Sequence, residues 1–161
     1  MITFLNIGHY GRLCNQLFQY GILYVVAKKN GYDFALPSDN FKIIDSSPNP
    51  VIGNKRDYMF LQIYECFNVT GKLLPKSEIS FDRIFEHGKD YSKFIPSVFD
   101  INDHTNIKGF FQSYKYFEGF ESELRKEFQF KREIEETTKD YFDGLKEEHK
   151  EKTITGIHVR R

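Results

Sequence analysis

The chain has 161 residues, enough for one well-filled domain and too few for two ordinary ones. Its 23 basic and 23 acidic residues cancel, which argues against a general nucleic-acid binder, because such domains carry a basic excess. Aromatic residues make up 17% of the chain, enough to fill a core, so intrinsic disorder is excluded.

The first 36 residues have the pattern of a βαβ unit. Residues 2–7 form an apolar run that stops at Gly8 and predicts a buried strand. Residues 13–27 carry apolar side chains on most sides, which predicts a buried helix with Gly31 as its C-terminal cap. Residues 33–36 predict a second strand. The ligand site of such a unit lies beyond the carboxyl ends of its strands.

Residues 38–103 are less regular, and we interpret them as a mixed insertion. Within them, residues 57–67 are rich in aromatic side chains and predict either a strand or a helix. His87 and His104 lie in polar surroundings, which favours positions at the surface. Residues 107–111 return to a strand pattern.

The last part of the chain carries helix signals followed by a strand signal. Two apolar stripes predict two amphipathic helices within residues 115–152, with the charges on their solvated faces. A partner-binding coiled coil is the alternative, although the apolar spacing does not continue for several heptads. Alternation over residues 153–159 predicts a buried strand, which ends at two arginines. The first stripe consists of Phe117, Phe120, Leu124 and Phe128, and the second of Ile134, Thr138, Tyr141 and Leu145.

The first candidate site is the loop and helix entry at residues 8–20. Backbone N–H groups converge at a helix N-terminus with a partial positive charge, and they can bind an anion or a sugar hydroxyl. Arg12, Asn15 and Gln16 add polar side chains where a core helix would be apolar. The glycine spacing matches neither the dinucleotide-binding nor the Walker pattern, and a turn with a helix cap explains the loop equally well.

The second candidate site is the end of the predicted last strand. Alternation places His158 and Arg160 on one face, and an arginine there can direct two N–H donors onto phosphate oxygens. A basic surface tail is the alternative. His158 has no cysteine or carboxylate beside it at ligand spacing, so we expect no metal site. A third segment, residues 108–117, is by itself a strand-to-helix junction with ordinary aromatic packing.

Together these segments resemble the α-1,2-fucosyltransferases of glycosyltransferase family 11. Residues 11–20, GRLCNQLFQY, are similar to the opening GRLGNQMFQY signature of the family, with Cys14 in place of a glycine. Residues 109–117, GFFQSYKYF, resemble its GYFQSxKYF block, and residues 158–161, HVRR, resemble the start of its HxRRGDY motif. The three motifs occur in the order of the family, which is much more specific than any one of them.

The resemblance implies a fold and a reaction. The fold is α/β: the N-terminal Rossmann-like half of a GT-B glycosyltransferase, with residues 1–152 as the acceptor-side domain and residues 153–161 as the first strand of the GDP-sugar-binding domain. The reaction is the inverting transfer of L-fucose from GDP-fucose to a galactose hydroxyl of a glycan, without a metal. Because the third motif of the family continues with Gly-Asp-Tyr, we expect this chain to be truncated and inactive by itself.

The resemblance also implies roles for single residues. Arg160 contacts the nucleotide diphosphate, Arg161 supports it and His158 lines the site, so Arg160 and His158 are the catalytic candidates. The N-terminal motif approaches the donor across the cleft. The candidates for donor binding are therefore Arg12, Asn15, Gln16, Arg160 and Arg161.

Two other functions stay open. One is a non-catalytic remnant domain that binds a glycan or a protein partner, and the other is an unrelated nucleotide- or phosphate-binding module. The two cysteines make no disulfide framework, and the sequence has no signal peptide or membrane-spanning run, so we expect a cytoplasmic protein. A lipid-linked glycan acceptor would bring it to the inner face of the membrane.

Overall fold

The computed structural model describes residues 1–8, 13–41, 61–88, 90 and 92–159. The chain divides into two compact units, residues 1–129 and residues 130–161. The first unit contains a five-stranded parallel sheet with helices, which confirms the predicted α/β class and is compatible with a Rossmann-like fold.

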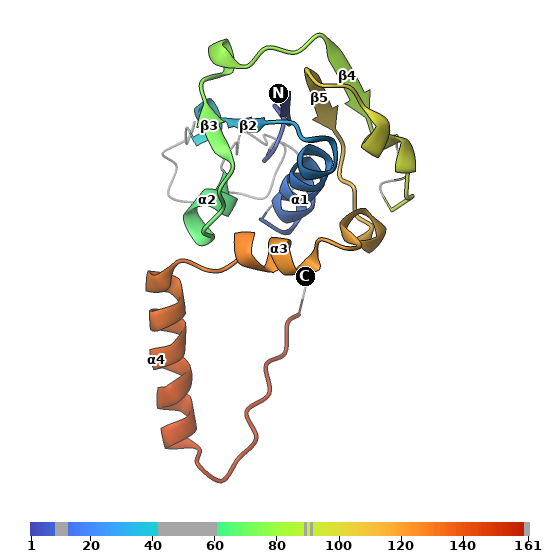
Figure 1. Cartoon of the computed structure of the whole chain (residues 1–161). Coiled ribbons are helices and arrows are strands. Elements are labelled where there is room, and N and C mark those ends of the chain that lie inside the picture. Colours follow the sequence, from blue (N-terminus) through green and yellow to red (C-terminus); the bar gives the residue numbers. More distant parts are fainter. Residues whose placement is uncertain (9–12, 42–60, 89, 91, 160–161) are drawn as a thin grey trace. The chain divides into compact units, whose positions relative to one another are not determined.

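Five short strands form the sheet: β1 (Ile2–Thr3), β2 (Phe34–Pro37), β3 (Lys72–Leu74), β4 (Arg83–Glu86) and β5 (Thr105–Lys108). Their order is β3-β2-β1-β5-β4, and each neighbouring pair is parallel (Figure 1). From β1 the chain proceeds to β2 and β3, and then crosses to the other side of β1 for β4 and β5. Since β2 and β3 lie on one side of β1 and the strands after the crossover lie on the other, the carboxyl ends of β1 and β5 mark the expected ligand crevice.

The first strand is shorter than predicted. The chain turns after β1: the N–H of Ile7 donates to the carbonyl of Phe4 over 3.2 Å, and Gly8 has a φ of +82°. Phe4 and Ile7 are nevertheless fully buried. A buried segment is apolar whether its backbone is extended or forms a turn. The apolar pattern therefore predicted a longer strand than the structure contains.

The helix α1 (Leu13–Asn30) is the predicted buried helix. It ends as predicted at Gly31, which has a φ of +69°, and the N–H of Tyr32 donates to the carbonyl of Ala27 over 2.9 Å. Figure 1 shows α1 at the centre of the view, with β2 and β3 on one side and β5 and β4 on the other. Its buried side chains therefore supply much of the core of the first unit.

Among the described residues, the further α-helices are α2 (Gln62–Cys66), α3 (Glu121–Glu127) and α4 (Arg132–Glu148). The aromatic stretch at residues 57–67 is thus helical in part, while residues 57–60 lie outside the described ranges. No helix in the described part of the chain is long and apolar enough to cross a membrane. The 3₁₀ turns are η1 (Ser38–Phe41), η2 (Lys76–Glu78), η3 (Pro96–Asp100) and η4 (Tyr114–Phe117).

The two predicted apolar stripes differ in the structure. The first is spread over η4, α3 and their flanks: Leu124 is buried, and Phe117, Phe120 and Phe128 pack against the core. The second lies on α4, in the second unit, where no residue is buried and Tyr141 is 71% exposed. Amphipathic spacing forms a helix in both cases, but only the first stripe is covered within its own unit.

The predicted strand at residues 153–159 is wrong for this structure. These residues have no secondary structure, and Ile157 is 84% exposed. A strand needs a neighbour for its N–H and C=O groups, and none of the described strands pairs with this segment.

The surface position expected for His87 is also wrong, whereas His104 is exposed as expected. His87 is only 3% exposed, because it follows β4 and lies against the loop after β5. Its Nδ1 lies 3.1 Å from the carbonyl oxygen of Gly88, and its Nε2 lies 2.8 Å from that of Lys93. Nε2 also lies 3.2 Å from the Tyr116 hydroxyl, so polar protein groups surround a ring that its polar neighbours in sequence had suggested was solvated.

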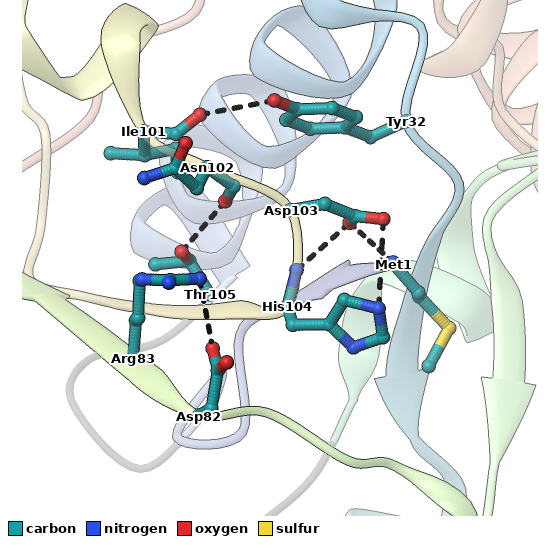
Figure 2. Close-up of polar contacts among 9 residues, drawn as sticks. All are labelled: Met1, Tyr32, Asp82, Arg83, Ile101, Asn102, Asp103, His104 and Thr105. Atoms are coloured by element: carbon teal, nitrogen blue, oxygen red, sulfur yellow. Dashed lines mark hydrogen bonds and ion pairs between the residues drawn. The ribbon is translucent and has the colours of Figure 1, made fainter.

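Polar contacts tie the amino ends of β1 and β5 together (Figure 2). The ammonium group of Met1 pairs with the carboxylate of Asp103, and the N–H of His104 donates to that carboxylate over 2.9 Å. Partial burial acts to raise the pKa of Asp103, but these two hydrogen bonds outweigh it and hold the pKa below its ordinary value. An ion pair and a hydrogen bond therefore stabilise the amino ends of these strands, opposite the carboxyl ends where ligands are expected.

A buried carboxylate joins three segments of the first unit. Glu127 in α3 accepts from the hydroxyl of Tyr20 at 2.5 Å, the hydroxyl of Thr70 at 2.6 Å and the N–H of Thr70 at 2.8 Å. The N–H of Gly71 donates to the Tyr20 oxygen over 3.0 Å, and the Tyr64 hydroxyl donates to the Gly71 carbonyl over 2.7 Å. Burial first, and the Glu127 carboxylate second, raise the pKa values of Tyr20 and Tyr64 far above the ordinary range.

This network predicts a loss of stability in alkali. In the unfolded chain both tyrosines ionise near pH 10, while in the folded chain they stay protonated. Stability is therefore complete below about pH 10, and above it the free energy of unfolding should fall by about 1.4 kcal/mol per pH unit for each tyrosine. Urea titrations across this range should show a weaker fall for Tyr64→Phe, whereas the exposed control Tyr141→Phe should match the wild type. Equal slopes in all three proteins would contradict the assignment.

Candidate functional site

The candidate site lies at the carboxyl ends of β1 and β5. These two strands are parallel neighbours, with Thr3 opposite Asn106. The chain leaves β1 toward the N-terminus of α1 and leaves β5 toward η4. Two of the three segments singled out in the sequence, residues 8–20 and 108–117, therefore follow adjacent strands and meet at the carboxyl end of the sheet.

Direct contacts join these two segments. The Nε2 of Gln112 donates to the Oδ1 of Asn15 over 2.8 Å, and the Nε2 of Gln19 donates to the carbonyl of Gly109 over 3.2 Å. The rings of Phe18 and Phe117 lie 5.8 Å apart. Each segment thus positions side chains of the other, although they are about 90 residues apart along the chain.

The loop after β5 has an unusual backbone. Gly109 has a φ of +133°, and Phe111 has a φ of +53°, a conformation that a bulky residue rarely adopts. The fully buried Phe111 ring holds it, with the rings of His87 at 4.9 Å and Tyr116 at 5.5 Å. The N–H of Ser113 then donates to the Phe111 carbonyl over 2.8 Å, which closes a three-residue turn around the exposed side chain of Gln112. Strain of this kind is often stored at functional sites.

The structure separates the motif residues into interior and surface groups. Gln16 is 2% exposed and accepts from the N–H of Ile63 over 3.2 Å, so its amide supports α2. Asn15 is half-buried and carries the contact with Gln112. Cys14, Gln112 and Tyr114 are exposed. Sequence reasoning gave no binding role to Gln112 or Tyr114, because one amide carries no signal by itself and nothing in the pattern distinguishes the exposed Tyr114 ring from the buried rings around it.

The remaining predicted site residues lie outside the described ranges or in the second unit. Arg12, Arg160 and Arg161 lie outside the described residues. His158 is exposed and belongs to the second unit. In the described ranges, no group of three histidine, cysteine or carboxylate side chains could hold a metal ion. The described site is therefore the meeting of the first two motifs alone.

A pocket of about 200 Å³ lies elsewhere on the first unit. It is formed where α1 ends and where β2 and β3 begin, away from the loops after β1 and β5. Its basic and acidic side chains come from Lys28, Lys72 and Asp33. Neither of the two motifs that meet at the carboxyl edge contributes to it.

Comparison with known proteins adds no relative: no family model, no curated protein and no solved structure matches the chain.

Proposed function

We propose that this chain is the acceptor-side part of an α-1,2-fucosyltransferase of GT-B architecture, which transfers L-fucose from GDP-fucose to a galactose hydroxyl with inversion. The observation that supports this proposal best is the contact between the first two motifs, Asn15 with Gln112 and Gln19 with Gly109, at the carboxyl edge of a parallel sheet. Motifs that serve one reaction have to meet in space. The protein that contains this chain would work in the cytoplasm, or at the inner membrane face on a lipid-linked acceptor.

The chemistry of this transfer places negative charge on the β-phosphate as GDP departs. In the proposal the Arg160 guanidinium stabilises that charge more strongly in the transition state than in the ground state, Arg161 supports it and His158 lines the site. Arg12 and Asn15 face the donor from the other wall. Because Gln16 is buried, its part is to hold the wall in place. Because arginines and not a metal ion stabilise the charge of the departing diphosphate, fucose transfer should persist in EDTA.

A second function is favoured by the exposed apolar side of α4. Tyr141 and Phe142 are both exposed there, as expected of a helix that binds a protein partner. In that case the chain would be a non-catalytic binding domain. Fucose transfer from GDP-fucose to a galactoside by the complete gene product separates the two functions.

We expect Arg160→Lys to lower kcat in the complete gene product by at least about a hundredfold. Lysine keeps one positive charge but loses the planar pair of donors, and the expected loss is that of one preorganised oxyanion donor. The matched control is Arg132→Lys, an exposed arginine on α4, which should leave kcat unchanged. Near wild-type turnover of Arg160→Lys would move the catalytic role to another residue.

A further inference from the structure

We propose that Tyr114, Gln112 and Asn15 form a subsite for one pyranose ring at the carboxyl edge of the sheet. The inference rests on the proposed function for the choice of sugars, which are the acceptor galactoside and the fucosyl group of the donor.

Tyr114 differs from the aromatic residues around it because its ring is exposed. The aromatic residues around it in the motif are used by the core: Phe111 and Tyr116 are fully buried, and Phe117 packs against α1. Tyr114 is 71% exposed. The face of an aromatic ring carries partial negative charge and meets the C–H groups that line one side of a pyranose, so an exposed ring beside polar groups suits a sugar.

The amide side chains of Gln112 and Asn15 offer one further donor and one further acceptor to a sugar. Because the Nε2 of Gln112 donates to the Oδ1 of Asn15, the two side chains also present the Nδ2 of Asn15 as a donor and the Oε1 of Gln112 as an acceptor. A sugar hydroxyl both donates and accepts, and can bond to the two groups at once. The Cα atoms of Gln112 and Tyr114 are at most about 7 Å apart, so a single ring can contact both residues.

The turn that carries Gln112 and the 3₁₀ turn η4 that carries Tyr114 are both held in place before a ligand binds. The buried Phe111 ring and the hydrogen bond from Ser113 fix the turn that carries Gln112. On the other side, the Tyr116 hydroxyl accepts from the N–H of Ile95 over 2.8 Å and donates to the carbonyl of Lys93 over 3.0 Å, which anchors η4. A site that is already ordered loses less entropy on binding.

The test is an NMR titration of the full 161-residue chain with ring-labelled tyrosine. Methyl β-D-galactopyranoside and methyl α-L-fucopyranoside are added separately, each to about tens of millimolar. We expect at least one of them to shift the Tyr114 resonance, identified by its loss in Tyr114→Ala, and to leave the Tyr141 resonance in place. Tyr141 is the matched control because it is equally exposed, at 71%.

Variants distinguish stacking from other contacts. Tyr114→Ala and Gln112→Ala should each weaken binding, the former at least about tenfold, followed through sugar signals in saturation-transfer spectra. Tyr114→Phe keeps the ring and should retain the affinity, as should Tyr141→Ala. All three changed side chains are exposed, so melting temperatures should stay within a few degrees of the wild type.

The outcomes separate this inference from the proposed function. A shift with the galactoside assigns the subsite to the acceptor, and a shift with the fucoside assigns it to the donor. No Tyr114 shift with either sugar, or equal affinity in Tyr114→Ala, overturns the subsite. If the sugars bind there but the complete gene product transfers no fucose, the proposed function fails and the subsite stands. If it transfers fucose with an unchanged KM for both substrates in Tyr114→Ala, the subsite fails and the proposed function stands.

Discussion

Replacing Glu127 with alanine is expected to lower the free energy of unfolding by about 3 kcal/mol or more. The change leaves the buried Tyr20 hydroxyl without its acceptor, a loss that costs about 1–3 kcal/mol, and adds smaller losses at the two partly buried donors of Thr70. It also removes a carboxylate that joins α1, α3 and the segment before β3. Urea unfolding followed by circular dichroism measures the loss.

The control for this variant is Glu121→Ala, an exposed carboxylate in the same helix, which should change stability by less than about 0.5 kcal/mol. A second readout follows from the hydrogen bond and the charge that Glu127 supplies to Tyr20. Without them the pKa of Tyr20 should fall toward its ordinary value, so that its phenolate appears at lower pH. An unfolding midpoint equal to that of Glu121→Ala would mean that the carboxylate stabilises nothing.

Gly109→Ala is expected to be at least as damaging, with a loss of about 3–4 kcal/mol. An alanine Cβ at this position would lie 2.5 Å from the Cβ of His87, and the φ of +133° strains any side chain. His87 cannot move aside easily, because its ring is buried and packs against the Phe111 ring, with a centroid distance of 4.9 Å. We also expect the turn at Gln112 to be displaced, and with it any sugar binding.

Two other glycines separate the causes of this loss. Gly88→Ala meets open space at an ordinary backbone angle and should cost little. Gly119→Ala also meets open space but has a φ of +83°, and should cost about 1–2 kcal/mol. The difference between Gly119→Ala and Gly109→Ala then measures the clash with His87 together with the strain of the larger φ at Gly109. If the two cost the same, the close packing at His87 is not rigid.

The elements that sequence could predict are those whose signals are local. The periodicity of α1 and its glycine cap depend on residues within a few positions of each other, and both are confirmed. The apolar run at residues 2–7 predicted burial correctly and the strand length wrongly, because a turn can be as buried as a strand. Residues 153–159 have the alternating side chains of a strand, but a strand also needs a neighbouring strand for its backbone hydrogen bonds, and a local pattern does not show whether one is present.

The candidate site shows the same limit. The sequence could single out the segments at residues 8–20 and 108–117 separately, but their contact depends on the strand order, which no local pattern encodes. Gln16 was expected to face a ligand and instead faces the interior, because polarity alone does not tell a buried, hydrogen-bonded amide from an exposed one. His87 was misplaced for the same reason.

The place of Glu127 in the chain has a consequence for dissection. It lies in the last helix before the boundary at residue 129, and Asn68 donates its N–H to the carbonyl of Gln129 over 2.9 Å. A fragment that ends at residue 129 therefore keeps every contact described for the sheet and the candidate site, whereas one that ends at residue 120 discards the carboxylate that closes the unit. Partial proteolysis should accordingly yield a persistent product cut just after residue 129, and that product would be the minimal piece on which to study sugar binding.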